Sequence, residues 1–150
     1  MASLHLICVG KLKDKSLENI EHDYLKRIKN PVLKIHEVKA KAENKDLEAK
    51  EILKKINSIS TNSFIVVLTE FGIEYGSPQF SKWLYTNLEN GKDIALVICG
   101  AEGPGDELLH ASHAKLSLSQ LTYPHKLARV LLIEQLYRAK TIHEGHPYHN

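Results

Sequence analysis

Three histidines near the end of the chain are the residues whose spacing most directly suggests chemistry. His143, His146 and His149 follow one another at intervals of three, and imidazole is the commonest metal ligand. The H-E-x-x-H pattern of many zinc enzymes is absent, because only two residues separate His143 from His146. Gly145 and Pro147 also interrupt the helix that would align the three rings, and no cysteine or carboxylate cluster completes a ligand set. We therefore expect no metal site.

Two arginines lie in the apolar sequence that precedes these histidines. A guanidinium in such surroundings needs a carboxylate, a backbone carbonyl or a phosphate as its partner. Glu134 lies four residues before Arg138, so an ion pair within one helix is one possible partner. Phosphate is the other, and the sequence leaves both roles open for Arg129 and Arg138.

A glycine-rich segment, Cys99–Gly105, follows an apolar run and would let a ligand approach the backbone closely. Neither G-x-G-x-x-G nor G-x-x-x-x-G-K-[ST] occurs, which disfavours a dinucleotide or nucleoside triphosphate site. A tight turn that binds nothing explains the glycines equally well. G-x-S-x-G is also absent, and Cys99 has no histidine beside it, so burial suits this thiol better than nucleophilic catalysis.

Alternating strands and helices must position these residues. Apolar runs predict strands, and apolar residues at helical spacing predict helices. The expected strands are Leu4–Val9, Val32–Val38, Phe64–Leu68 and Ile94–Ile98, and the expected helices are 14–29, 44–58, 77–90 and 124–143. Ser77 and Thr122, each near a proline, are the expected caps of the last two helices.

The continuous apolar runs FIVVL and IALVI are typical of parallel strands that are covered on both faces. The fold class is therefore α/β, a parallel-sheet sandwich, with one domain over residues 1–150 and ligands beyond the carboxyl ends of the central strands. The last helix is apolar around most of its circumference, so it needs cover on more than one side. We expect a homodimer to supply part of that cover.

Composition narrows the class of protein. Of the 150 residues, 43% are hydrophobic and 25% are charged, which argues against disorder and low complexity. The only cysteines, Cys8 and Cys99, lie in apolar runs and suit a reducing cytoplasm. We see no signal peptide and no membrane-spanning run. Residues 1–60 carry 13 Lys/Arg against 9 Asp/Glu, a basic excess that attracts phosphate backbones or simply forms a solvated helix face.

The segment Leu116–Ala139, LSLSQLTYPHKLARVLLIEQLYRA, and the tail GHPYH resemble the ribosomal RNA large subunit methyltransferase H family, a small branch of the SPOUT methyltransferases. The opening HLICVGKLK and the strand and loop IALVICGAEG resemble it too, so the likeness spans nearly the whole chain. It implies methylation of N3 of a pseudouridine in large-subunit (23S) ribosomal RNA, within the assembled ribosome, with S-adenosylmethionine as cofactor. It also implies a homodimer and a C-terminal trefoil knot, which composition and periodicity do not predict.

The resemblance places the cofactor among three loops that follow the strands, where backbone groups and apolar walls can hold an adenine and a methionine moiety. The cofactor-binding residues it implies are Leu68, Cys99, Gly100, Gly103, Leu118, Ser119, Gln120, Leu121, Thr122 and Tyr123. The family usually has glycine at the position of Cys99. Cysteine is tolerated there if the backbone makes the contact, but not if a glycine-specific backbone angle is required.

The resemblance also implies that the tail acts on the target base. The imide N–H must lose its proton, and His149 is the candidate base or member of a proton network, because imidazole exchanges protons near neutral pH. Tyr148 would stack on or position the base, and Arg138 would hold phosphate or neutralise negative charge. The expected RNA contacts are Arg129, His125 and Lys11. Asn150 stands where a basic residue is common, so one RNA contact is missing at the chain end.

Two alternatives remain open. A non-catalytic ribosome- or RNA-binding module with the same fold would bind phosphate without the cofactor, and the intact P-Y-H tail argues against it. A SPOUT methyltransferase that acts on transfer RNA or another nucleotide is the second. The small size of the chain and the lack of a separate RNA-binding domain disfavour it only modestly.

Overall fold

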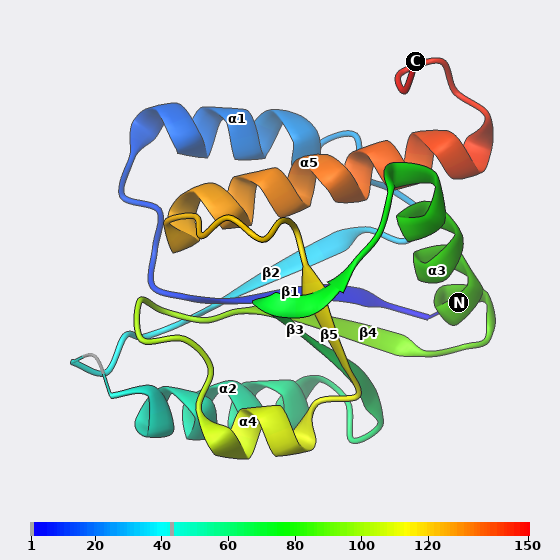
Figure 1. Ribbon diagram of the computed structural model, residues 1–150. Coiled ribbons are helices and arrows are strands. Elements are labelled where there is room, and N and C mark those ends of the chain that lie inside the picture. Colours follow the sequence, from blue (N-terminus) through cyan, green and yellow to red (C-terminus); the bar gives the residue numbers. More distant parts are fainter. Residues whose placement is uncertain (1, 43) are drawn as a thin grey trace.

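The computed structural model describes residues 2–42 and 44–150. Five parallel strands form one sheet in the order β2-β1-β4-β3-β5 (Figure 1). The strands are β1 (Leu4–Val9), β2 (Leu33–Val38), β3 (Ser63–Glu74), β4 (Asp93–Ile98) and β5 (Ala114–Ser117). The α/β class with a parallel sheet is confirmed, whereas the trefoil knot stays a prediction from the resemblance.

Helices cover both faces of this sheet, as Figure 1 shows. The helices are α1 (Lys15–Leu25), α2 (Lys45–Ile59), α3 (Ser77–Glu89), α4 (Asp106–Ala111) and α5 (His125–Glu144). One face packs against α1, α3 and α5, and the other against α2 and α4. Because successive strand residues point to opposite faces, Leu6 lies in the first core and Ile7 in the second.

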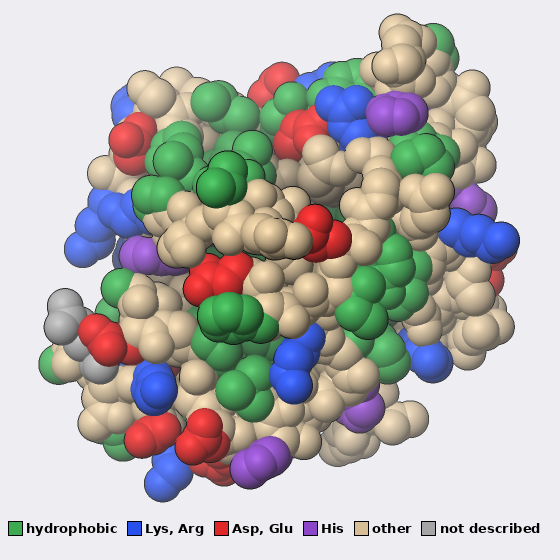
Figure 2. Space-filling view, in the orientation of Figure 1, with side chains coloured by type: hydrophobic (Ala, Val, Ile, Leu, Met, Phe, Trp, Pro, Cys, Tyr) green, Lys and Arg blue, Asp and Glu red, His purple; other side chains and the backbone are tan. Residues whose placement is uncertain are grey.

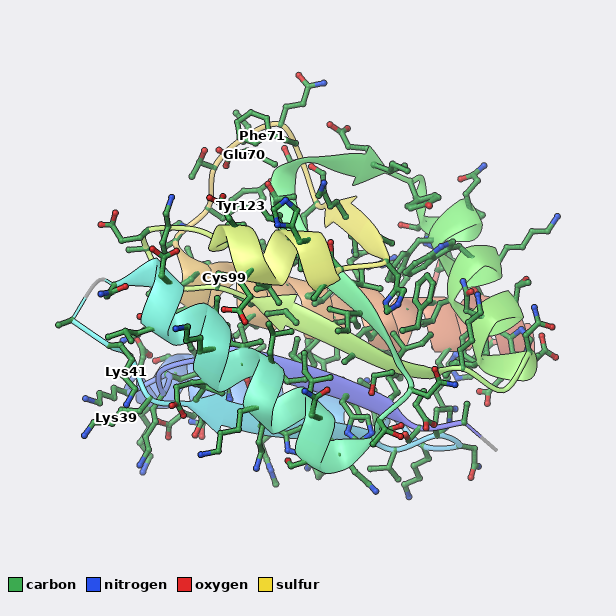
Figure 3. The ribbon with its side chains drawn as sticks, turned by 90° about the horizontal axis from the view of Figure 1, so that it is seen from below. Lys39, Lys41, Glu70, Phe71, Cys99 and Tyr123 are labelled. Atoms are coloured by element: carbon green, nitrogen blue, oxygen red, sulfur yellow. The ribbon has the colours of Figure 1, made fainter. Side chains whose placement is uncertain are left out.

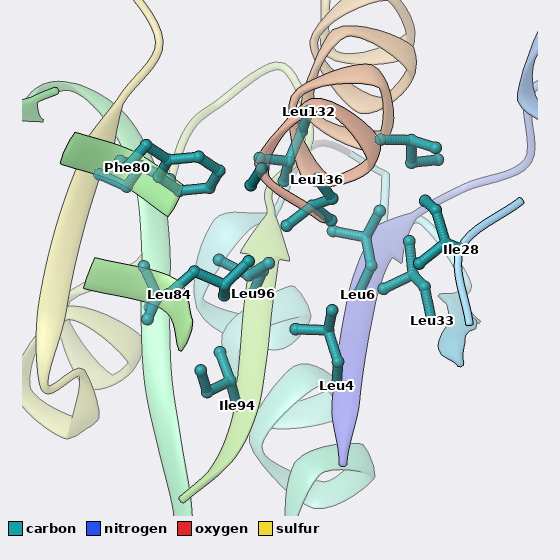
Figure 4. Packing of buried hydrophobic residues seen from close by; sticks show 14 of the residues in the cluster. Leu4, Leu6, Ile28, Leu33, Phe80, Leu84, Ile94, Leu96, Leu132 and Leu136 are labelled. Atoms are coloured by element: carbon teal, nitrogen blue, oxygen red, sulfur yellow. The ribbon is translucent and has the colours of Figure 1, made fainter. Parts of the chain in front are cut away.

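The core between the sheet and α5 holds the longest helix in place. Leu132 and Leu136 of α5 are almost fully buried and lie over Leu6 and Leu96 of the sheet (Figure 4). The opposite side of α5 is less covered, and its Leu131 is 43% exposed. The apolar circumference of this helix is therefore only partly buried within one chain.

Four features differ from the sequence-based expectation. Helix α4 and strand β5 were not predicted, because elements of six and four residues are too short to show a clear period. Ser77 is not a cap: Gly76 holds that position, and the Ser77 hydroxyl donates to Gln135. Thr122 is not a cap either, since α5 starts after Pro124 without a side-chain cap.

Strand β3 carries an irregularity that shapes the site. Leu68 and Ile73 both pair with Leu116 of β5, so residues 69–72 leave the ladder and bulge outward. Gly72 permits this path, because a Cβ there would lie 2.7 Å from the backbone of Leu116. The bulge projects side chains beyond the carboxyl edge of the sheet.

No described helix has the length and apolar character that crossing a membrane requires. Cys8 and Cys99 are buried and unpaired, in agreement with the interpretation of these residues as core thiols.

Candidate functional site

A cleft of about 1070 Å³ opens beyond the carboxyl ends of β3, β4 and β5. Three segments enclose it: the bulge of β3, the loop after β4, and the irregular segment between β5 and α5. Of the predicted cofactor-binding residues, all line this cleft except Gln120, which is exposed and does not. Figure 3 shows Glu70, Phe71 and Tyr123 gathered on one side of it, with Cys99, which directly follows β4, nearer the sheet.

The walls of the cleft suit a ligand with a flat apolar part and polar ends. Leu68 and Leu118 are half-buried and Leu121 is 70% exposed, so they offer apolar surface. The segment that carries the last two is held by its own side chains: the Ser117 hydroxyl donates to Ser119 O at 2.8 Å, and Leu121 N–H donates to Ser119 Oγ at 3.0 Å. Fixed loops with apolar walls match an adenine and a methionine moiety, so the residues present fit the implied cofactor.

The rim of the cleft is formed by Thr122, Glu70 and Phe71. The sequence placed Glu70 and Phe71 in the segment that follows FIVVL at its carboxyl end, but assigned neither of them a role. Thr122 donates its hydroxyl to Glu70 Oε2 at 2.9 Å, which ties the last loop to the bulge and explains why this threonine does not cap α5. Phe71 beside it is 88% exposed. In the sequence, the segment TEFG interrupts the apolar run FIVVL and does not begin with a turn residue. This interruption was the signal for these residues.

The glycines of the loop after β4 serve mainly to pack it against α2. A Cβ on Gly105 would lie 2.8 Å from Lys45 O, and a Cβ on Gly100 would lie 3.0 Å from Glu48 Oε1. Gly103 has φ of 79° and closes a turn in which its N–H donates to Gly100 O. The loop therefore approaches the helix closely, and this closeness fixes the floor of the cleft.

Cys99 occupies its position without strain. It is not among the described residues with positive φ, so no glycine-specific backbone angle is required there. Burial raises the pKa of the Cys99 thiol to about 12, and the negative charge of Glu48 adds to the rise. A thiol with so high a pKa is protonated at neutral pH and is not a nucleophile.

The position of Arg129 corrects its assignment as an RNA contact. The residue is 6% exposed, and its guanidinium donates to both carboxylate oxygens of Glu21, at 2.7 and 2.9 Å, and to Glu37 at 2.8 Å. Carboxylates on α1 and β2 thus take the bonds that phosphate was expected to take, because α1 packs directly against α5. The assignment of exposed Lys11 and half-buried His125 as RNA contacts stays a prediction, and His125 lines the cleft.

The predicted catalytic residues form a separate cluster on the second half of α5. Glu134 is its centre: Arg138 donates to Glu134 Oε1 at 2.6 and 3.0 Å, and the Tyr148 hydroxyl donates to the same oxygen at 3.0 Å. Arg138 also lies over the Tyr148 ring, 4.9 Å from its centroid. The expected ion pair within the helix is therefore present and anchors the tail. From the sequence alone, Glu134 could be identified only as the helical partner of Arg138.

His149 is held by the same arginine. Arg138 Nη1 lies 3.0 Å from His149 Nδ1, and arginine can only donate. Nδ1 therefore accepts, and the neutral ring carries its proton on Nε2. In this arrangement His149 offers a donor to a substrate rather than a free basic nitrogen.

Tyr148 is likewise fixed in its protonated form. Burial raises the pKa of the Tyr148 hydroxyl, and the hydrogen bonds with Tyr24 and Glu134 raise it further. Tyr148 also packs edge-on against Tyr137, with ring centroids 4.8 Å apart. The tail is thus a rigid group of hydrogen-bond donors.

The cleft and the tail cluster do not meet within one chain. His125, at the start of α5, lines the cleft, while Arg138 lies thirteen residues further along the helix. At 1.5 Å per residue these positions are about 20 Å apart. Among the described residues, no group of His, Cys, Asp or Glu could hold a metal ion, and the three tail histidines do not converge.

The chain matches known proteins over nearly its whole length. The family model described as "Predicted SPOUT methyltransferase" matches residues 2–149. A protein of Prochlorococcus marinus (strain NATL1A), named ribosomal RNA large subunit methyltransferase H, is 41% identical over 96% of this chain and 93% of its own. Proteins of the same name from Clostridium acetobutylicum (98% of this chain, 99% of its own) and Enterococcus faecalis (97% and 98%) are 36% and 35% identical.

Proposed function

Because the chain belongs to the SPOUT methyltransferase family, we propose that it methylates large-subunit ribosomal RNA with S-adenosylmethionine as methyl donor. The proposed target is N3 of a pseudouridine in 23S ribosomal RNA, reached in the assembled ribosome in the cytoplasm. The observation that carries the proposal is the cleft, since three segments distant in sequence converge there and present apolar walls and backbone groups. The names of the relatives supply the class of substrate.

The cleft residues would bind and orient the cofactor. Leu68, Leu118 and Leu121 would cover its apolar part, and the backbone of the loop after β4 would hold its polar part. When bound, S-adenosylmethionine supplies a methyl group on a sulfonium that a ring nitrogen can attack. The protein's main task is then alignment, which can contribute ~7–11 kcal/mol to lowering a barrier.

The tail residues would act on the target base. As the imide loses its proton, negative charge develops on the carbonyl oxygens that flank the nitrogen. His149 Nε2–H would donate to one of these oxygens, and Arg138, which holds His149 at 3.0 Å, would add positive charge nearby. Protonated Tyr148 would position the base through its ring or hydroxyl.

A homodimer would bring the two groups together. Arg138 lies ten residues beyond Ala128, the last residue of α5 that lines the cleft, which is about 15 Å along the helix, so one subunit does not assemble the whole site. Figure 2 shows hydrophobic side chains gathered over α1 and the first half of α5, and Ile20, Leu127 and Leu131 are each more than 40% exposed. We propose that this surface pairs two subunits so that the tail of one faces the cleft of the other.

Transfer of a labelled methyl group from S-adenosylmethionine tests the proposal, with intact ribosomes, free large subunits and transfer RNA as alternative substrates. We expect label in 23S RNA of intact ribosomes, and nucleoside analysis should find it on N3 of a pseudouridine. Label in transfer RNA would favour the alternative of a SPOUT methyltransferase that acts on transfer RNA. Ribosome binding without cofactor binding, measured by calorimetry, would favour the non-catalytic module.

A further inference from the structure

A buried carboxylate lies directly behind the floor of the cleft. Glu48 of α2 is 4% exposed, and its Oε2 accepts the backbone N–H of Lys41 at 3.1 Å. Its other oxygen, Oε1, would lie 3.0 Å from a Cβ on Gly100, a residue that lines the cleft. A single backbone residue therefore separates this carboxylate from the ligand space.

The charge of Glu48 has no side-chain counterion. Among the residues that the structure describes, no Lys, Arg or His nitrogen lies within 4 Å of its carboxylate. It stands instead in the first turn of α2, at the positive end of the helix dipole, and accepts the Lys41 N–H. The negative charge acts at the cleft itself, because it contributes to the raised pKa of Cys99.

The other charged groups that line the cleft do not outweigh the negative charge of Glu48. Two carboxylates, Glu70 and Glu102, line the cleft at exposed positions, against one lysine, Lys115, and the imidazole of His125. The buried carboxylate differs from the rim groups because water and salt screen it far less. Its effect on a ligand charge in the cleft should therefore dominate.

We propose that Glu48 makes the cleft selective for a cation, so that it favours the sulfonium of S-adenosylmethionine over the neutral thioether of S-adenosylhomocysteine. This inference rests on the proposed function, since it names how that cleft distinguishes donor from product. On transfer the sulfur keeps the bonding pair and loses its charge, while the target nitrogen, whose proton has passed to a water molecule, forms the new bond to the methyl carbon. The attraction to Glu48 ends with this step, which favours release of the product.

The substitution Glu48→Gln tests this selectivity. Glutamine keeps the size and the acceptor for Lys41 N–H, and removes only the charge. By calorimetric titration with each ligand, we expect the Kd for S-adenosylmethionine to rise about five- to twentyfold, as expected for charges roughly 10 to 17 Å apart at an effective dielectric constant near 20. The Kd for S-adenosylhomocysteine should change less than about twofold, because its sulfur is uncharged. Glu51→Gln, on the same helix but outside the cleft, is the matched control, and we expect its two Kd values to keep their wild-type ratio because this carboxylate does not line the ligand space.

Equal losses for both ligands, or no change for either, would overturn the inference and leave Glu48 as a support for the Lys41 loop. A wild-type protein that binds neither ligand would instead refute the proposed function. If Glu48→Gln does not fold, the wild type supplies the test through a cofactor analogue with a tertiary amine in place of the sulfonium. We expect the pKa of that amine to rise on binding, and a fall or no change would contradict the inference.

Discussion

The cleft and the tail cluster consist of different kinds of chemical groups. The cleft is made of loop backbone, closely packed glycines and apolar side chains, and the Thr122–Glu70 bond is the main polar link across its rim. The tail cluster joins side chains to one another, with Glu134 accepting from Arg138 and Tyr148 over distances of 2.6 to 3.0 Å.

This difference matches two tasks. Binding a ligand by shape spreads the free energy over many contacts, so single substitutions should cost little. Stabilising the charge that develops on the target base depends on a few donors in fixed geometry, so single substitutions should cost much. Turnover should therefore be sensitive at the tail, and cofactor affinity only mildly sensitive at the cleft.

The largest effect is expected for His149→Ala. Loss of a group that takes part in proton transfer or charge stabilisation should lower kcat about 10²- to 10⁴-fold. The Kd for S-adenosylmethionine should stay unchanged, because His149 is proposed to contact the target base through Nε2–H and is not among the residues that line the cleft. Single-turnover methyl transfer and calorimetry measure the two quantities, with His110→Ala on α4 as control. Loss of cofactor affinity would show that His149 contacts the cofactor. Cofactor binding and chemistry would then no longer be separate tasks of the cleft and the tail.

Arg138→Lys should have the next largest effect. Lysine keeps the charge but cannot contact Glu134 and His149 at once as the planar guanidinium does. Loss of one charge-assisted hydrogen bond predicts a fall in kcat of about tenfold. Thermal unfolding of the same variant separates this effect from lost stability. A rise in ribosome KM with unchanged kcat would show instead that Arg138 serves as a phosphate contact.

Tyr148→Phe should lower kcat about fivefold through loss of one hydrogen bond to Glu134. The pKa of Tyr148 is raised above its ordinary value of 10.0, chiefly by burial, so the hydroxyl is protonated at working pH. The alkaline limb of the pH–rate profile should therefore be the same in both proteins.

The same shift predicts a difference in stability. A group with a raised folded-state pKa contributes stability in full below its unfolded pKa and loses that contribution as pH rises further. The free energy of unfolding of the wild type should thus fall above about pH 10, in excess of any fall in Tyr148→Phe. Urea titrations at pH 8 and pH 10.5 measure the free energy of unfolding of both proteins. An equal fall in both proteins between these two pH values would show that burial does not hinder the ionisation of Tyr148.

The two regions also differed in how far the sequence revealed them. The carboxyl-end segments could be placed at one edge because FIVVL and IALVI predict parallel strands, and parallel strands bring these ends together. The partners of Arg129 could not be foreseen, since Glu21 and Glu37 reach it only through the packing of α1 and β2 around α5. Glu48 was hidden for a related reason, because its role depends on how closely Gly100 approaches α2.

Leu118→Ala should have a small effect, and it should fall on cofactor affinity rather than on kcat. Removing part of a half-buried apolar wall should raise the Kd for S-adenosylmethionine about threefold, while kcat at saturating cofactor stays within about twofold of wild type. Leu47→Ala, which shortens an equally apolar but exposed side chain on α2, is the control. A large fall in kcat at saturation would mean that this wall also aligns the reacting atoms.

Cys99→Ala should have the smallest effect, although Cys99 lines the cleft. Its thiol has a pKa of about 12, so almost none of it is ionised at neutral pH, and its backbone adopts no angle that glycine alone allows. Both kcat and the cofactor Kd should stay within about twofold of wild type, and native protein should resist alkylation by iodoacetamide at pH 8. If the substitution abolished turnover, a nucleophilic cysteine would have to act in the cleft, and chemistry could no longer be assigned to the tail alone.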